Sequence, residues 1–504
     1  MKRTSPLPLI LLLIPLLLGT AAMAQASEGA PAEDLLRQSL SIHRNGRHNH
    51  LLTGLRRLRD PDLQPLFAYL ATSTLAPLEA HGILGLAELK PKRGINLEQV
   101  AQIDDAQIQG QVITLAMDQD LLSQDNAQQL ISWQDLDAAV KLLIVTRLIE
   151  AGTFNDKAIL DQLAEATHLG HRCFAALLLT ELGDPAGTEG LQELERMTDP
   201  RRNGIREALL RTALAHRFVS ASSWAFAVST DADAPNPLSL LALRVAIGLG
   251  HSDAVDLWRQ RYESTADTAE RIRLARTALT VSPWLKDDLF DLPSASEDEL
   301  IAQIGRTGQA IVAGSPRDIA EQLVALVQQN HPLSNRWVLW YAREHVQPAD
   351  AQSILLALIQ AAEDGAPQDK ALRLQFTVEA TEAIYDLNPQ TAAGLLRPIL
   401  ADNTTDPRQI EAILLGLVSS KTTGTNQVIE NLPAFGTLDA NNLTLLIRSN
   451  NDAALNENEL KDLQRLVRDP ALDDGLNVRA AWSYLKYTNR SRAVLKSVLK
   501  SQGE

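Results

Sequence analysis

The segment Gly250-His251-Ser252-Asp253-Ala254 resembles the G-x-S-x-G turn that exposes a catalytic serine. Its last glycine is missing, and the residues before it have helical periodicity where that turn requires a strand. Serine and aspartate are also preferred residues at the start of a helix. We therefore interpret Ser252 or Asp253 as the N-cap of the next helix, and we predict no catalytic residue in this chain.

Histidines near the N-terminus are of the type that binds metal ions. His43, His48 and His50 stand among several arginines, but no carboxylate cluster or H-E-x-x-H spacing accompanies them. We interpret this segment as a solvated basic helix, and we predict neither a metal nor a cofactor. The single cysteine, Cys173, lies in an apolar helical run, which is typical of a buried thiol.

An aromatic strip is the remaining candidate for binding. Trp337, Trp340 and Tyr341 have the spacing that places three residues on one face of a helix. Exposed aromatic side chains of this kind stack on sugars or anchor a protein partner. The alternative is that the strip packs between neighbouring helices of the core.

Composition indicates a folded protein built mainly from helices. The chain has 504 residues, of which 45% are hydrophobic and only 4% aromatic. A core of this kind consists mostly of Leu, Ile, Val and Ala, which favours helices over strands. The formal net charge of −15 gives no electrostatic reason to expect nucleic acid as a partner.

The first residues have the pattern of a secretory signal peptide. Met1-Lys2-Arg3 is followed by an apolar run and by small residues that permit cleavage after Ala24 or Ala26. We predict a signal peptide over residues 1–24 and a polar spacer over residues 25–33. The chain is then periplasmic or secreted, with no transmembrane segment after cleavage.

The stretch from Leu179 to Leu214 shows the organisation expected for the rest of the chain. It contains a helix end, a Gly-Asp-Pro turn, a helix, the Asp199-Pro200 turn and another helix. Two helices this short cannot bury two apolar stripes by themselves, so they need similar neighbours on both sides. We expect helix pairs over residues 34–281 and 296–500, with a break between them. Pro316, Pro348, Pro389 and Pro407 are expected to open helices.

Short motifs in these pairs resemble the HEAT-repeat family. Asp199-Pro200 precedes Ile205-Arg206, Asp469-Pro470 precedes Val478-Arg479, and Ile272-Arg273 matches the second half of the motif. The resemblance implies an all-α, armadillo-like superhelical array of antiparallel helix pairs. It also implies that Asp199, Arg206, Arg273 and Arg479 bridge adjacent repeats and have structural roles. A tetratricopeptide-like or mixed helical solenoid remains the alternative.

These patterns favour binding over catalysis. We expect an exported scaffold that binds an unidentified protein partner and has no chemistry of its own. The alternative is a superhelix that binds glycan or cell wall as an accessory to an envelope enzyme, with Trp337, Trp340 and Tyr341 as contacts. A third possibility is a polysaccharide-acting enzyme with a helical-toroid fold, which would need His, Tyr, Asn and Arg side chains to converge in one cleft.

Overall fold

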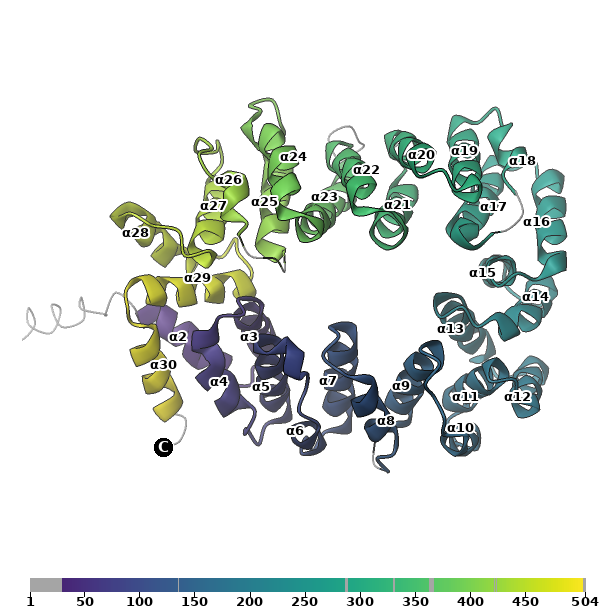
Figure 1. Cartoon of the computed structure of the whole chain (residues 1–504), viewed down its shortest axis with the longest axis horizontal. Helices are drawn as coiled ribbons and strands as arrows, with labels where there is room; N and C mark the ends of the chain where they lie inside the picture. Colours follow the sequence, from purple (N-terminus) through teal and green to yellow (C-terminus); the bar gives the residue numbers. More distant parts are fainter. Residues whose placement is uncertain are drawn as a thin grey trace, which may run out of the picture. The chain divides into compact units, whose positions relative to one another are not determined.

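The computed structural model describes residues 30–134, 136–285, 289–329, 331–361, 367–420, 422 and 424–501. Every regular element in these ranges is a helix, and most helices pack against their neighbours in the chain (Figure 1). This confirms the predicted all-α, solenoid-like array of helix pairs. None of the described helices is long and apolar enough to cross a membrane. The predicted signal peptide, and residues 25–29 of the predicted spacer, lie outside the described residues.

The helices fall into two compact units, and the first unit combines both ends of the chain. It contains residues 30–103 and 448–501 of the described chain. Its helices are α2 (Ala30–Ser39), α3 (Arg47–Arg57), η1 (Pro61–Leu63), α4 (Gln64–Leu70), α5 (Ala76–Leu89), η2 (Pro91–Arg93), α6 (Leu97–Ala101), α28 (Glu457–Leu466), α29 (Asp474–Tyr487) and α30 (Ser491–Lys500).

The second unit comprises residues 104–447. It begins with α7 (Ala106–Asp118), α8 (Gln124–Ile131), α9 (Ala138–Glu150), α10 (Lys157–Ala164), α11 (Leu169–Glu181), α12 (Pro185–Arg196), α13 (Arg202–Ala215), η3 (Val219–Ala221), α14 (Ser222–Thr230), α15 (Asn236–Gly248), α16 (Ser252–Ser264) and α17 (Thr268–Val281). It continues with η4 (Ser282–Trp284), α18 (Asp291–Ser294), α19 (Glu299–Ala313), α20 (Pro316–Gln328), α21 (Pro332–His345), α22 (Pro348–Gln360), α23 (Pro367–Leu387), α24 (Pro389–Ala401), α25 (Pro407–Ser419), α26 (Asn426–Ile429) and α27 (Leu438–Asn450), in which the chain returns to the first unit.

These boundaries differ from those expected from the sequence. Helix α2 already begins at Ala30, inside the expected spacer of residues 25–33, and it buries Ala32. The expected break near residues 282–295 is not a unit boundary, because α17 and η4 both pack against α19. Loop-like composition therefore did not mark a separation between compact units.

Prolines begin several helices of the second unit. Pro316, Pro348, Pro389 and Pro407 each occupy the first helical position, as predicted. A backbone N–H at the first helical position has no acceptor inside the helix. Proline lacks this N–H, so it is tolerated at this position. Asp406 caps α25 by accepting a hydrogen bond from the backbone N–H of Arg408.

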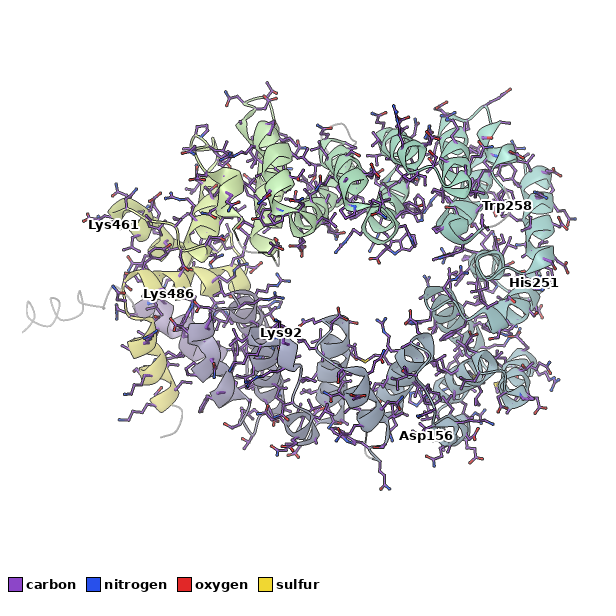
Figure 2. The ribbon with its side chains drawn as sticks, viewed as in Figure 1. Lys92, Asp156, His251, Trp258, Lys461 and Lys486 are labelled. Carbon is purple, nitrogen blue, oxygen red and sulfur yellow. The ribbon has the colours of Figure 1, made fainter. Side chains whose placement is uncertain are left out.

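Within the first unit, helices from the C-terminal part of the chain pack against helices from its N-terminal part. Helix α29 packs against both α2 and α3. Asp60 supports this contact, because its carboxylate accepts a 2.8 Å hydrogen bond from Nε1 of Trp482 and lies 3.0 Å from Nζ of Lys486 (labelled in Figure 2). Burial alone would raise the pKa of Asp60, but these partners and the N–H of Asp62 hold it below 3.8, its ordinary value.

Pairs of glycines allow two helix hairpins to approach closely. A Cβ at Gly82 of α5 would overlap the backbone N of Ala71, and one at Gly85 would overlap the ring of Phe67. The second unit repeats this arrangement in α19, where Gly305 lies on the backbone of Ser294 and Gly308 on the ring of Phe290. Corresponding residues have the same spacing, from 67 to 85 and from 290 to 308. The same packing device therefore occurs in both units.

The four residues assigned to bridges between repeats have different surroundings. Arg206 of α13 is 1% exposed, and it pairs with Glu195 of α12 and with Asp231 at the end of α14, at 2.9 Å. Arg479 of α29 is also buried, and burial, together with the charge of Arg57 on α3, lowers its pKa to about 10. Both arginines therefore lie between packed helices.

Asp199 and Arg273 differ from the expectation, because their ion pairs are local. Asp199 pairs with Arg201 two residues later, and these contacts lower the pKa of Asp199 to about 2. Arg273 is half exposed and pairs with Glu270 of its own helix, α17. Neither of these two ion pairs joins adjacent repeats, because Arg201 and Glu270 lie within three residues of Asp199 and Arg273, respectively.

We predict that Gly305→Ala destabilises the protein by about 1–3 kcal/mol, because the added methyl group would force α19 away from the backbone of Ser294. The matched control is Gly394→Ala in α24. Nothing lies within 4 Å of a Cβ at Gly394, so the higher helix propensity of alanine should stabilise by about 0.5–1 kcal/mol. Urea denaturation followed by circular dichroism measures both changes. Equal effects of the two substitutions would contradict the proposed close packing.

We also predict that Asp60→Asn destabilises the protein at pH 7 by about 1–3 kcal/mol, because it weakens charge-assisted hydrogen bonds. The folded-state pKa of Asp60 lies below its unfolded value, so its contribution is present above pH 3.8 and is lost as pH falls further. Wild type and Asp60→Asn should therefore converge in stability as the pH falls below 3.8. Denaturant titrations at several pH values test this.

Asp62→Asn is the control for the Asp60 experiment, since the partner of Asp62, Arg492, is 86% exposed. It should cost less than about 1 kcal/mol. A difference between wild type and Asp60→Asn that stays constant down to the acid limit would disprove the role of the charge.

Candidate functional site

The predicted aromatic strip on α21 is divided between core and surface. Trp337 is 8% exposed and Tyr341 is 4% exposed, whereas Trp340 is 38% exposed. Burial raises the pKa of the Tyr341 hydroxyl to about 12. The indole N–H of Trp337 is buried and has no acceptor among the described residues. Trp337 and Tyr341 therefore belong to the core, and Trp340 alone of the three offers a substantial surface.

Trp340 lies in a cluster of rings that the sequence did not indicate. The ring centroids of Trp340 and Trp284 are 6.2 Å apart at an interplanar angle of 61°, and His345 lies 4.9 Å from Trp340. Such edge-to-face contacts are favourable for aromatic pairs. Trp284 comes from η4, far from α21 in the sequence, so the cluster is created by packing within the second unit.

A cation lies against this cluster. The guanidinium carbon of Arg217 is 4.9 Å from the centroid of the Trp284 ring, in cation–π distance. Arg217 also donates a 2.9 Å hydrogen bond from Nη1 to the carbonyl of Gly248 at the end of α15. Burial lowers the pKa of Arg217. The side chain of Arg217 thus makes two contacts, one with the carbonyl of Gly248 and one with the face of the Trp284 ring.

We define the aromatic site as Trp284, Trp340, His345 and Arg217. Burial lowers the pKa of His345, although the charge of Glu344 opposes this, so its ring is uncharged at neutral pH. The site thus combines two indoles, a neutral imidazole and one cation. Aromatic rings in general stack on apolar surfaces, and arginine is among the residues that often dominate binding energy at interfaces.

Trp284 and Arg217 could not be assigned to this site from the sequence, because no short spacing connects them to the strip on α21. Trp284 follows α17 and Arg217 follows α13, whereas His345 ends α21 four residues after Tyr341 and so has the helical spacing of the strip. The available signals were the neighbouring tryptophans Trp337 and Trp340 and the helical spacing of His345 from Tyr341. Only the packing of the second unit shows which of these lie together.

The other sequence candidates occupy structural positions. Helix α16 begins at Ser252 and His251 is its N-cap residue, so the N-cap lies one residue before the predicted Ser252 or Asp253. The Ser252 hydroxyl donates to the Asp253 carboxylate at 3.0 Å. His251 instead stacks on Phe226, with ring centroids 4.3 Å apart. Its position at the start of α16 is labelled in Figure 2.

The N-terminal histidines and Cys173 also have defined surroundings. Nδ1 of His48 accepts a hydrogen bond from the backbone N–H of His43 at 3.1 Å. No group of three or more His, Cys, Asp or Glu side chains in the described part of the chain has the arrangement of a metal site. Cys173 is buried, and burial is the main cause of its raised thiol pKa.

Comparisons with known proteins add no family. No family model matches the sequence, and no curated protein matches it. One solved structure, described as an engineered protein, is 13% identical in sequence to this chain and has a TM-score of 0.20. The match covers 79% of this chain and 98% of the engineered protein. Such a TM-score supports no inference about fold or function, so the aromatic site has to be interpreted from its own geometry.

Proposed function

We propose that this chain is an exported, HEAT-like repeat protein that serves as a protein–protein interaction scaffold and has no chemistry of its own. The aromatic site is proposed as a contact point for the partner. The observation that carries this proposal is the exposure of Trp340 beside Trp284 and Arg217. Tryptophan and arginine are enriched among the residues that dominate binding energy at protein interfaces.

The array supports this role because it holds the site on packed helices. The ring of Trp340 makes an edge-to-face contact with the buried Tyr341 ring, and Arg217 lies over the ring of Trp284. Side chains fixed in this way lose little conformational entropy when a partner binds. Export is proposed from the N-terminal sequence pattern, with the mature chain in the periplasm or secreted.

Glycan or cell-wall binding is the second candidate, and the same exposed indole favours it. An exposed tryptophan face stacks on the apolar face of a sugar ring as well as on a protein side chain. In this case the protein would be an accessory to an envelope enzyme. The scaffold and the glycan-binding proposals share the aromatic site. They differ in the ligand, which is a protein in the first and a sugar in the second.

We predict that Trp340→Ala weakens partner binding by about 30-fold, the equivalent of the roughly 2 kcal/mol lost at a hot-spot residue. The experiment is affinity capture with the tagged mature chain from the envelope fraction of its source cell, followed by mass spectrometry at two salt concentrations. A stoichiometric protein that is retained by wild type and lost with Trp340→Ala is the expected result.

Leu333→Ala is the matched control, because Leu333 is an exposed apolar residue on the same helix, 51% exposed. It should retain the partner. Sugar or wall fragments lost with Trp340→Ala, without any protein, would favour the glycan candidate. Equal retention of all bound material by wild type and both variants would exclude the aromatic site as the contact.

A further inference from the structure

A second feature of the 104–447 unit is a groove lined by arginines from three neighbouring helices. Arg211 lies on α13, Arg244 on α15, and Arg273 and Arg276 on α17. Helix α15 packs against both α13 and α17, and the three lie in one row in Figure 1. We refer to these four residues as the arginine groove. None of them belongs to the aromatic site.

Two adjoining hollows form the groove. One, of 260 Å³, is lined by Arg211 and Arg244, and the other, of 460 Å³, by Arg244, Arg273 and Arg276. Pro237, Leu240 and Thr277 line both hollows, so Arg244 lies at the point where they meet. The lining therefore combines apolar side chains with four arginines, and Glu207 is the one carboxylate among the residues that line the two hollows.

The positive charges of the groove are only partly balanced. Arg211 pairs with Glu207 at 2.7 Å and Arg273 pairs with Glu270 at 2.5 Å. Among the described residues, no carboxylate forms an ion pair with Arg244 or Arg276. Both side chains are partly buried, and Nε of Arg244 is shut off from solvent without a hydrogen-bond partner. Two guanidinium charges thus remain uncompensated within one groove.

This arrangement is unfavourable without a bound anion. A guanidinium group stays charged when it is desolvated, and a buried charge is strongly destabilising unless it is paired. Burial, followed by the charges of Arg211 and Arg276, lowers the pKa of Arg244, which shows that the arginines repel one another. The repulsion arises in a chain with a net charge of −15, where carboxylates are abundant elsewhere. An anion between Arg244 and Arg276 would remove both the repulsion and the unpaired donor.

The groove fits a phosphate group in particular. Guanidinium groups bind phosphate oxygens through two parallel N–H donors, and two uncompensated charges match a doubly charged oxyanion. The first residues of α15, Asn236 and Pro237, also line the groove, and the positive end of a helix dipole favours an anion there. We propose that the arginine groove binds phosphate, either as the free ion or as a phosphate monoester whose organic part contacts Leu240.

The test is isothermal titration calorimetry of the full mature chain at about pH 8, where phosphate is doubly charged. Inorganic phosphate, phenyl phosphate and succinate are titrated separately at constant ionic strength maintained with sodium chloride. Wild type should bind the two phosphates more tightly than succinate. Arg244→Gln should weaken phosphate binding at least ten-fold, since it removes the guanidinium shared by both hollows.

Two further variants complete the design. Arg276→Gln should weaken binding to a similar extent, and it provides an independent test if Arg244→Gln does not fold. Arg317→Gln is the control, because Arg317 of α20 is 87% exposed and lies outside the groove, so phosphate affinity should not change. Tighter binding of phenyl phosphate than of inorganic phosphate would identify a monoester as the natural ligand, and equal binding would identify the free ion.

Three results would overturn the proposal. These are no binding of either phosphate by wild type, unchanged phosphate affinity in both Arg244→Gln and Arg276→Gln, and tighter binding of succinate than of either phosphate. The outcome is independent of the scaffold function, because Trp340→Ala leaves the groove intact and Arg244→Gln leaves the aromatic site intact.

Discussion

A pair of short helices cannot bury both of its apolar faces, and the whole chain depends on this constraint. Each pair is stable only where neighbours cover it, so helices pack against one another along the sequence. In the first unit, α29 lies on α2 and α3, so a helix from the C-terminal part of the chain and helices from its N-terminal part cover each other. The carboxylate of Asp60, with Trp482 and Lys486, adds a directional contact to this interface, and so does the ion pair of Arg47 on α3 with Asp474 on α29.

Close packing of this kind restricts which amino acids can occupy the positions where helices touch. At Gly82 and Gly305 the opposing atoms belong to backbone, which cannot move aside for a methyl group, so glycine is required there. Buried polar groups are restricted as well, because they must find partners on a neighbouring helix. Arg206 meets this requirement with Glu195 and Asp231, and Trp224 of α14 donates a further hydrogen bond to Glu195. Buried Arg56 is likewise paired with Glu88 of a neighbouring helix, α5.

The sequence predicts the fold better than it predicts the sites. Helical periodicity and the prolines at 316, 348, 389 and 407 report local backbone preferences, and the structure confirms the helices that they open. Which arginine is buried is decided by packing over many residues, so the same motif gave a buried Arg206 and a half-exposed Arg273. Trp337 and Trp340 differ in exposure for the same reason, since residues three positions apart on one helix can lie on either side of the boundary between core and surface. The union of the two chain ends in one unit has no local signal at all.

Stacked helix pairs also explain why both proposed binding sites escape motif-based analysis. In such an array, residues become neighbours when they occupy equivalent places on successive repeats, not when they are close in sequence. Arg211, Arg244 and Arg276 recur about once per repeat, at an interval close to that between the helix-opening prolines 316 and 348. Three arginines at this spacing are unremarkable in sequence, yet they meet in one groove because α15 packs between α13 and α17. The proposed phosphate site is therefore a row of side chains across helices, and the repeat interval is the spacing at which to search for such rows in the sequence.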